Sequence, residues 1–361
     1  AAPAARVASC SVTSLLDLGL PTLTTHAEAS CSPAHVLVCG DGDLSYSHAL
    51  ARYLGAHASV VATSYESEPE FAQRYPHATE TPEQLRTAGT RVEFNVDARK
   101  ILEHFPTQEA WDRIVFNIPQ APPVPKARNQ IQRHRALLRD FCASAASALS
   151  ARGELWLTLL AGQGGTPLDP VQRLVGNTWQ LQHEAARAGL LITRVGLPDM
   201  DTLAAVGYMP AGRGYRGQQL GRWRHSQGLV THVLEHEGDG RRSVSPLEWV
   251  FDNSFWVDGV PRSEEALAQI GRDALQEDAD ALAGPPTLLD IYTSEEGRHS
   301  RTYRFYYASS LLALSRERAL QLNAQLCEAV AAAGAGLPRT PSSEALSALV
   351  ASASDADLAG S

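Results

Sequence analysis

Lysine, cysteine and long hydrophobic runs are scarce in this sequence. Only Lys100 and Lys126 are lysines, so arginine supplies nearly all of the 31 basic residues. The five cysteines include no CxxC pair and no cluster with histidine at zinc-ligand spacing, which argues against a disulfide framework and a structural zinc site. No stretch approaches the roughly 20 apolar residues of a membrane helix. We therefore expect a soluble, non-secreted protein of a reducing compartment, with no membrane or metal partner.

Positive charge is also in the minority. The 40 acidic residues give a formal net charge of −9, which excludes a uniformly basic surface of the kind that coats nucleic acid. Local basic patches remain compatible with this value, because net charge averages over the whole surface. The length of 361 residues, with 44% hydrophobic and 20% charged residues, is typical of a globular chain with two domains.

Strand-like and helix-like segments alternate from residue 35 to residue 234. Short, β-branched apolar runs lie at 35–39, 59–64, 91–96, 112–117, 153–160 and 190–196, and helical spacing recurs at 46–55, 128–150 and 171–188. This α/β alternation predicts a doubly wound parallel sheet. A further strand at 229–234 follows a Gly/Arg-rich loop with no predicted helix, and we expect it to insert antiparallel.

A charged linker at 235–246 ends this pattern and predicts a second domain over 247–339. There, strand-like runs at 249–257, 287–293, 301–309 and near 336–339 are interleaved with helix-like runs at 263–275 and 315–333. This order predicts an α+β, ferredoxin-like sandwich. The Ala/Ser/Thr-rich segment 1–33 and the Ser/Ala-rich segment 340–361 are expected to be flexible or disordered tails.

The turn after the first strand carries two glycines and two carboxylates. Gly40 and Gly42 allow the backbone to turn tightly and approach a ligand at the start of a helix. Asp41 and Asp43 argue against a pyrophosphate there, and Ser45 replaces the third glycine of a dinucleotide fingerprint. A phosphate-free ligand that carries a cationic sulfonium suits this turn better.

Two further acidic residues follow the next strands. Glu66 lies where an acidic side chain binds ribose hydroxyls, and Asp97 lies where one meets an adenine edge. Because parallel strands end at one edge, these loops converge, and together they imply S-adenosylmethionine as cofactor. The alternative for each residue alone is a helix cap or a solvated charge.

The fourth strand ends in Asn117, with Pro119 and Gln120 following. An asparagine at a strand end, held by a proline, suits the Watson–Crick edge of a base. The alternative is an Asx turn that leaves the strand.

These motifs resemble a known domain. GDGDLSYS, ATSYES, VDA, DRIVFNIPQ, IQRHRALLRDF, GELWLTLLAG and a later GYR are similar, in order and spacing, to the eukaryotic 25S ribosomal RNA uridine-N3 methyltransferase-like domain, over about 35–234. The resemblance implies a Rossmann-like methyltransferase fold. It also implies that S-adenosylmethionine binds at Gly40, Asp41, Gly42, Glu66, Asp97 and Asn117, to which we add Asp43 of the same turn.

The chain departs from that family at two positions. Gln120 replaces the family histidine after Asn-x-Pro, and His134 replaces an asparagine of the next helix. Uridine N3 must lose its proton during methyl transfer, so the titratable group matters. We predict Asn117, Gln120 and His134 as the catalytic set, with His134 as the base. The departures leave open a catalytically inactive RNA-binding or assembly factor with the same fold.

The second domain resembles the ferredoxin-fold anticodon-binding domain of phenylalanyl-tRNA synthetases. FDNSFWV and LLDIYTSEEGRHSRTYRFYYAS carry the likeness, with Asp290 and Tyr292 as its centre. We do not expect a synthetase, because the residues that its catalytic core would need are occupied by the methyltransferase-like sequence. The two modules together are similar to the ferredoxin-fold anticodon-binding domain-containing proteins, which implies ribosomal RNA, and secondly transfer RNA, as partner, and a cytoplasmic, nuclear or nucleolar location. A purely protein-binding role for the second domain is the third hypothesis.

Arginine is concentrated in the first domain. Residues 35–234 hold 20 basic and 18 acidic residues, whereas 241–332 hold 9 and 14. The runs 113–139 and 212–225 contain no acidic residue, although a solvated helix face and a structured loop are the respective alternatives. Arginines near aromatic rings suit RNA. The predicted RNA-binding residues are Lys126, Arg128, Arg133, Arg135, Arg213, Tyr215, Arg216, Trp223 and, unless it is paired across the sheet, Arg304.

Overall fold

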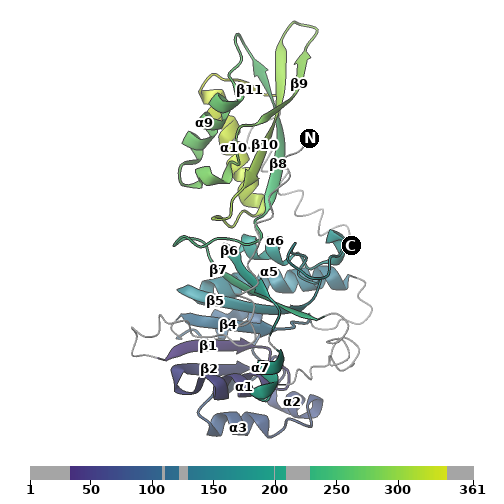
Figure 1. The fold of residues 1–361 in the computed structure, drawn as a ribbon, viewed down its shortest axis with the longest axis vertical. Helices are drawn as coiled ribbons and strands as arrows, with labels where there is room; N and C mark the ends of the chain where they lie inside the picture. Colours follow the sequence, from purple (N-terminus) through teal and green to yellow (C-terminus); the bar gives the residue numbers. More distant parts are fainter. Residues whose placement is uncertain (1–32, 108–109, 122–128, 199, 209–227, 340–361) are drawn as a thin grey trace.

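The computed structural model describes residues 33–107, 110–121, 129–198, 200–208 and 228–339. The predicted tails lie outside these residues apart from Pro33, as do Lys126, Arg128 and the whole run 212–225. Two sheets follow one another along the longest axis of the molecule, with the second sheet above the first in Figure 1.

The first sheet has seven strands in the order β3-β2-β1-β4-β5-β7-β6. Its first five strands pair in parallel, whereas β7 is antiparallel to both β5 and β6. This mixed sheet is of the Rossmann-like methyltransferase type, so the predicted fold class and the antiparallel insertion are confirmed. The strands are β1 Ala34–Cys39, β2 Ala58–Thr63, β3 Arg91–Glu93, β4 Trp111–Asn117, β5 Leu149–Leu160, β6 Leu190–Gly196 and β7 Leu229–His236.

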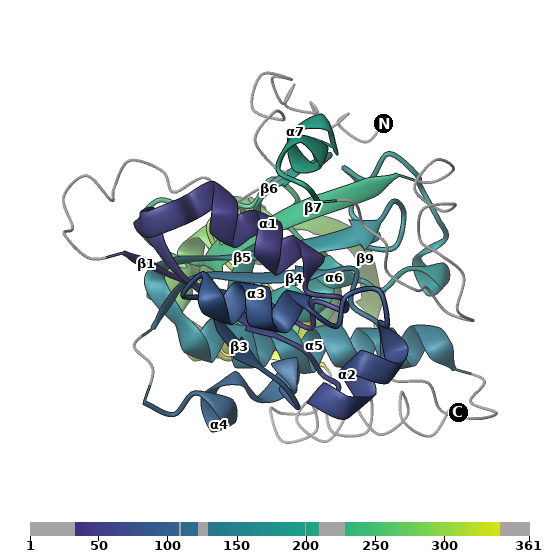
Figure 2. The same ribbon diagram turned by 90° about the horizontal axis from the view of Figure 1, so that it is seen from below.

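Helices cover both faces of this sheet. Figure 2 shows α1 and α7 on one side of the strands and α4 and α5 on the other. Successive side chains of β1 pack on opposite faces of the sheet: Val36 and Val38 pack with α1, whereas Leu37 and Cys39 pack with α5. The helices are α1 Ser45–Leu54, α2 Glu68–Arg74, α3 Thr81–Thr87, α4 Ile101–His104, α5 Gln130–Ala148, α6 Leu181–Arg187 and α7 Met200–Ala205.

The predicted helix over 171–188 is the largest error in this region. Only α6 is helical there, and Leu174 and Val175, which produced the helical spacing, are exposed to solvent. Pro167, Pro170 and Gly176 favour a turn, and a 3₁₀ turn forms over Val175–Asn177. The short helix α7 between β6 and β7 was not predicted.

The second sheet is antiparallel, with the order β11-β8-β10-β9. This is the order of a ferredoxin-like sandwich, as predicted from the segment pattern. Its helices pack on one face, where Gly271 leaves no room for a Cβ beside Leu326, so the two helices lie close together. The elements are β8 Glu248–Val257, α9 Glu264–Leu275, β9 Thr287–Thr293, β10 His299–Ala308, α10 Arg316–Ala332 and β11 Leu337–Pro338.

The two sheets are joined by polar and apolar contacts around α6 and the end of β7. The carboxylate of Glu237 accepts hydrogen bonds from Arg318 at 2.8 and 2.9 Å, and Arg318 also reaches Asp278 at 2.6 Å. Ala186, Leu191, Leu247 and Ala313 form a small apolar cluster. The second domain is therefore packed directly on α6 and its neighbours.

No helix within the described ranges is long and apolar enough to cross a membrane.

Candidate cofactor and base site

The glycine turn is built between β1 and β2. The Gly40 amide donates to Thr63 Oγ1 at 3.2 Å, and the Thr63 hydroxyl donates to the Val38 carbonyl at 2.8 Å. Gly40 has a φ of +57°, and a Cβ there would lie 2.9 Å from Cε2 of Phe116. Only glycine fits this position, so the backbone of the turn packs directly against Phe116 at the end of β4. Thr63 was not identified from sequence, because its role depends on a neighbouring strand.

The two aspartates of the turn face the start of α1. Asp41 Oδ2 accepts from the amide and the hydroxyl of Ser47, both at 2.7 Å, and Asp43 Oδ1 accepts from the amide of Ser45 at 3.1 Å. Burial raises the pKa of Asp41 to about 7, against the opposing hydrogen bonds from Ser47. Both carboxyl groups thus organise the turn at the helix start, although that of Asp41 is only partly ionised at neutral pH.

Tyr75 is a site residue that sequence reasoning missed. Its hydroxyl oxygen would lie 2.7 Å from a Cβ at Gly42, so the phenol covers the turn. Burial raises the pKa of Tyr75 to about 12, and the charges of Glu66, Asp43 and Asp41 act in the same direction. The hydroxyl is therefore a hydrogen-bond donor amid three carboxylates, and no spacing in the sequence indicates this.

Glu66 and Asp97 occupy the ends of the neighbouring strands but are engaged with arginines. Glu66 accepts from Ser64 Oγ at 2.9 Å and from Arg74 Nη1 at 2.6 Å. Asp97 accepts hydrogen bonds from the Arg99 guanidinium with both oxygens, from Nε at Oδ1 and from Nη2 at Oδ2. Burial alone would raise the pKa of Asp97, but the hydrogen bonds from Arg99 lower it below its ordinary value. A ligand at either carboxylate has to displace an exposed arginine side chain.

Asn117 ends β4 beside the glycine turn, since Phe116 pairs with Cys39 in the sheet. Its side chain shares a hydrogen bond with the Tyr46 hydroxyl, from the first turn of α1. The chain then turns sharply: Ile118 has a φ of +51°, and its amide donates to the Thr158 carbonyl at 2.8 Å. This turn carries Gln120 towards α5.

The structure brings Gln120 and His134 together. His134 Nε2 lies 3.3 Å from the Gln120 side-chain amide, at the atom assigned as Oε1, and Nδ1 lies 2.8 Å from the Gln130 carbonyl. Burial lowers the pKa of His134, so the ring is neutral with its proton on Nδ1. The lone pair on Nε2 then suits the NH₂ end of Gln120, which fixes how this amide is oriented.

Trp179 supports this histidine from the loop after β5. The two rings are stacked at 4.1 Å between centroids with an angle of 10° between their planes. Trp179 is a further residue that sequence reasoning missed, because it lies 45 positions beyond His134 in the chain and on a different element. The stack holds the imidazole plane fixed.

The described members of the predicted RNA set have structural partners. Arg135 donates to the carbonyls of Val175, Gly176 and Thr178 at 2.8 to 3.1 Å, and Arg133 lies 3.4 Å from the Gln130 side chain. These contacts place Arg135 on the side of α5 next to the loop after β5. Their contact with RNA stays a prediction.

Two other arginines are paired with carboxylates. Arg113, part of the acid-free run 113–139, is buried and lies 3.2 Å from Glu154, so it does not contribute to a basic surface as expected. Arg304 binds Asp252 through two hydrogen bonds of 2.7 Å, which is the cross-sheet pairing considered as its alternative. RNA contact at Arg304 also stays a prediction.

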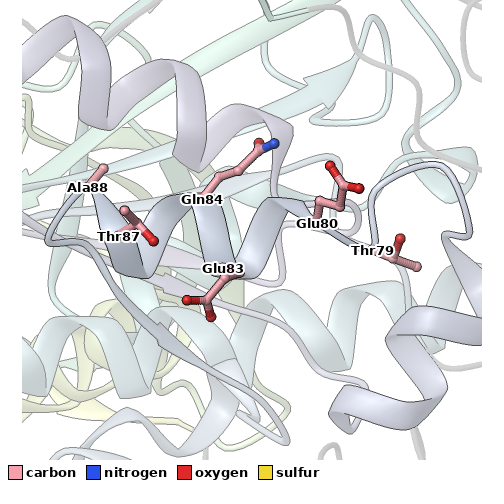
Figure 3. Close-up of a pocket in the computed structure, with 6 residues that line it drawn as sticks. All are labelled: Thr79, Glu80, Glu83, Gln84, Thr87 and Ala88. Atoms are coloured by element: carbon pink, nitrogen blue, oxygen red, sulfur yellow. The ribbon is translucent and has the colours of Figure 1, made fainter.

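Two other features are separate from this site. Among the described residues, no three histidine, cysteine, aspartate or glutamate side chains gather at a place that could hold a metal ion. Figure 3 shows an open hollow along α3, to which the glycine turn contributes no side chain. It is lined by Thr79, Glu80, Glu83, Gln84, Thr87 and Ala88.

Comparison with known proteins relates these observations to a family. The profile of the BMT5-like family, described as rRNA (uridine-N3-)-methyltransferase, matches residues 37–197. The human ferredoxin-fold anticodon-binding domain-containing protein 1 is 32% identical over 246 residues, which cover 68% of this chain and 38% of that protein. Its mouse homologue is 33% identical over 203 residues, covering 56% and 31%. The chain thus spans about a third of the length of these relatives.

Solved structures with a similar arrangement are distant in sequence. The 16S rRNA methyltransferase KamB is 13% identical, with a TM-score of 0.35 over 59% of this chain and 92% of that one. An O-methyltransferase of Brevibacillus brevis in complex with S-adenosyl-L-homocysteine is 13% identical, with a TM-score of 0.33 over 56% and 66%. Residues 37–197 are thus similar to the BMT5-like family, and the chain resembles the ferredoxin-fold anticodon-binding domain-containing proteins over about a third of their length.

Proposed function

We propose that this chain is an S-adenosylmethionine-dependent RNA base methyltransferase that acts on N3 of uridine in ribosomal RNA. The observation that carries the proposal is the placement of Asn117 beside the glycine turn, with the Gln120–His134 pair reached through the next turn. A cofactor cradle and hydrogen-bonding groups for a planar base thus share one edge of the sheet. The BMT5-like match over 37–197 supports the choice of uridine N3.

The turn fits S-adenosylmethionine by shape and by charge. Gly40 and Gly42 have no side chains, and Phe116 and Tyr75 pack directly against their backbone, so the turn stays compact beside the site. Asp43 and Glu66, together with the partly ionised Asp41, supply the negative charge that a cationic ligand requires, once Arg74 has moved away from Glu66. When bound, the cofactor supplies an electrophilic methyl group on a positively charged sulfur.

The chain's own residues then have to hold the base and remove one proton. The amides of Asn117 and Gln120 can pair with the carbonyls and the N3–H group of uracil. The N3 proton passes to Nε2 of His134, while Nδ1–H stays on the Gln130 carbonyl and stabilises the imidazolium that forms. Nε2 becomes available only when Gln120 turns from the ring to the base, so base binding and base activation are linked.

Methyl transfer from labelled S-adenosylmethionine to ribosomal RNA tests this function. We expect Asn117→Ala and His134→Gln each to lower kcat/KM by about 100-fold, the lower end of what general acid–base groups contribute. Gln325→Ala, an exposed position on α10, is the control and should match the wild type. Equal incorporation by wild type and Asn117→Ala would contradict the proposal.

One observation favours a second candidate, a non-catalytic RNA-binding or assembly factor. Both ring nitrogens of His134 already have partners, and the ring is buried against Trp179, which leaves no base in the resting arrangement. Calorimetric titration with S-adenosylmethionine separates the two candidates. RNA affinity without any heat of cofactor binding would select the non-catalytic factor.

We also propose that the second domain contacts RNA, on the face of its sheet that the helices leave open. Arg298 lies 4.5 Å above the Trp256 ring, and Arg339 lies 4.5 Å from the Tyr292 ring and 5.1 Å from Trp256. Neither arginine has an acidic partner within the described residues. These rings hold two uncompensated guanidinium groups in place, which suits RNA phosphates.

The salt dependence of transfer RNA binding tests this contact. Replacing both arginines, Arg298→Ala/Arg339→Ala, should lower the slope of log K against log salt by about 1.4, since each single-strand phosphate contact contributes about 0.7. Arg316→Ala is the matched control, because this exposed arginine of the same domain lies on α10, away from the open face of the sheet. An unchanged slope in the double variant would exclude this surface.

A further inference from the structure

The loop between β5 and α6 exposes apolar side chains at the edge of the candidate site. Leu174 is 79% exposed and Val175 is 65% exposed, and Val171 and Leu168 of the same loop are also exposed. Large apolar side chains rarely remain in water together without a partner. These side chains therefore do not form the buried face that their spacing predicted.

This tip is held rigidly. Arg135 of α5 donates to the carbonyls of Val175, Gly176 and Thr178, and the Thr178 hydroxyl donates to the Val175 carbonyl at 2.9 Å. Gly165 leaves no room for a Cβ, because Thr178 Oγ1 would lie 2.5 Å away. The exposed side chains therefore extend from a stiff turn whose backbone carbonyls accept hydrogen bonds from Arg135 and Thr178.

The tip also lies beside the residues proposed to hold the base. The Asn177 amide donates to the Leu174 carbonyl at 2.8 Å, so Leu174 begins the turn that leads to Trp179. Trp179 in turn stacks on His134, whose ring contacts Gln120. One continuous segment thus connects the apolar tip to the histidine.

We propose that Leu174 and Val175 form a wedge that enters the base stack of a folded RNA and fills the space left when the target nucleotide turns into the site. This inference rests on the proposed function. The N3 edge of a paired uridine faces its partner base, so the nucleotide must leave the helix before its N3 can react. Apolar side chains inserted between base steps compensate the lost stacking, and a stiff tip does so with little loss of side-chain entropy.

The test compares a structured with an unstructured RNA, using the full chain. The probes are the poly(A)·poly(U) duplex, the single strand poly(U), and a short RNA duplex with 2-aminopurine beside a central uridine. We expect Leu174→Ala/Val175→Ala to lose about tenfold in methyl transfer to the duplex while keeping its rate on poly(U). The variant should also lose the 2-aminopurine fluorescence rise that wild type produces. Val260→Ala, a 92% exposed valine of the second domain, is the control.

The outcomes distinguish the wedge from the proposed function. If wild type transfers methyl groups to neither RNA, the proposed function fails, and the fluorescence alone decides the wedge. Equal losses on duplex and single strand would make the tip a general RNA contact and overturn the wedge. Unchanged behaviour of the double variant on all three probes would also overturn it and would leave the tip as a protein contact.

Discussion

Gly40 offers a quantitative test of how the cofactor turn is built, because the chain contains a glycine with which to compare it. Gly40 and Gly334, the latter just after the end of α10, have φ values of +57° and +62°. A Cβ at Gly40 would lie 2.9 Å from the Phe116 ring, whereas a Cβ at Gly334 would have nothing within 4 Å. Alanine meets the cost of a positive φ at both positions, and only Gly40→Ala adds a collision.

The Phe116 ring cannot move away from an added Cβ without a cost in free energy. Phe116 is buried and packs edge to face on Phe141 at 4.7 Å, so its ring cannot swing into solvent. Left-handed backbone costs an alanine about 1–2 kcal/mol, and overpacking a core costs about 1–3 kcal/mol more. We expect Gly334→Ala to lower the free energy of unfolding by about 1 kcal/mol and Gly40→Ala by about 3 kcal/mol.

Urea unfolding followed by circular dichroism measures both variants, with an unchanged m-value as the sign that only stability has altered. Cofactor titration on the folded variants should show weaker binding for Gly40→Ala alone, since Phe116 precedes Asn117 and borders the turn. Equal destabilisation of the two variants would refute the steric argument and leave backbone strain as the whole effect.

Three further predictions concern other parts of the chain. Because burial raises the pKa of Asp41 from 3.8 to about 7, its ionisation destabilises the fold as pH rises through that range, and Asp41→Asn should flatten this decline in urea titrations. Arg135→Ala should cost about 2 kcal/mol and open the amides of residues 175–178 to hydrogen exchange, whereas the exposed Arg139→Ala should cost under about 1 kcal/mol. Arg318→Ala removes the ion pair with Glu237 that links the two domains, together with the Asp278 contact inside the second domain, and calorimetry should then resolve two melting transitions, with one expected for wild type.

Much of the fold could be predicted because its determinants are local. Continuous apolar runs mark strands buried on two faces, and β1, β2, β4 and β5 lie within a few residues of the expected ranges. The helix predicted at 171–188 failed for an instructive reason. The apolar spacing of Leu174 and Val175 there does not indicate a buried face, because both side chains face solvent.

The site was predictable only in part, because several of its contacts depend on the topology. Gln120 and His134 are in contact, while Asn117 lies beside the glycine turn and their catalytic roles stay a prediction. Trp179 and Tyr75 reach this region from distant segments without a local signal. The acid-free run around Arg113 shows the same limit. Its partner Glu154 lies on the neighbouring strand β5, so counting charges along the sequence wrongly predicted that Arg113 adds to a basic surface.

The helix α6 restricts how the two halves of this chain could be recombined. Trp179, just before it, stacks on His134, while Gln182 binds Ser245 at 3.0 Å and Arg187 binds Glu317 at 3.0 Å in the second half. A chimera that joins a different module after β7 would leave Gln182 and Arg187 without these partners. Exchange of the second domain between homologues therefore requires that α6 and the segment 237–247 be transferred with it as one unit.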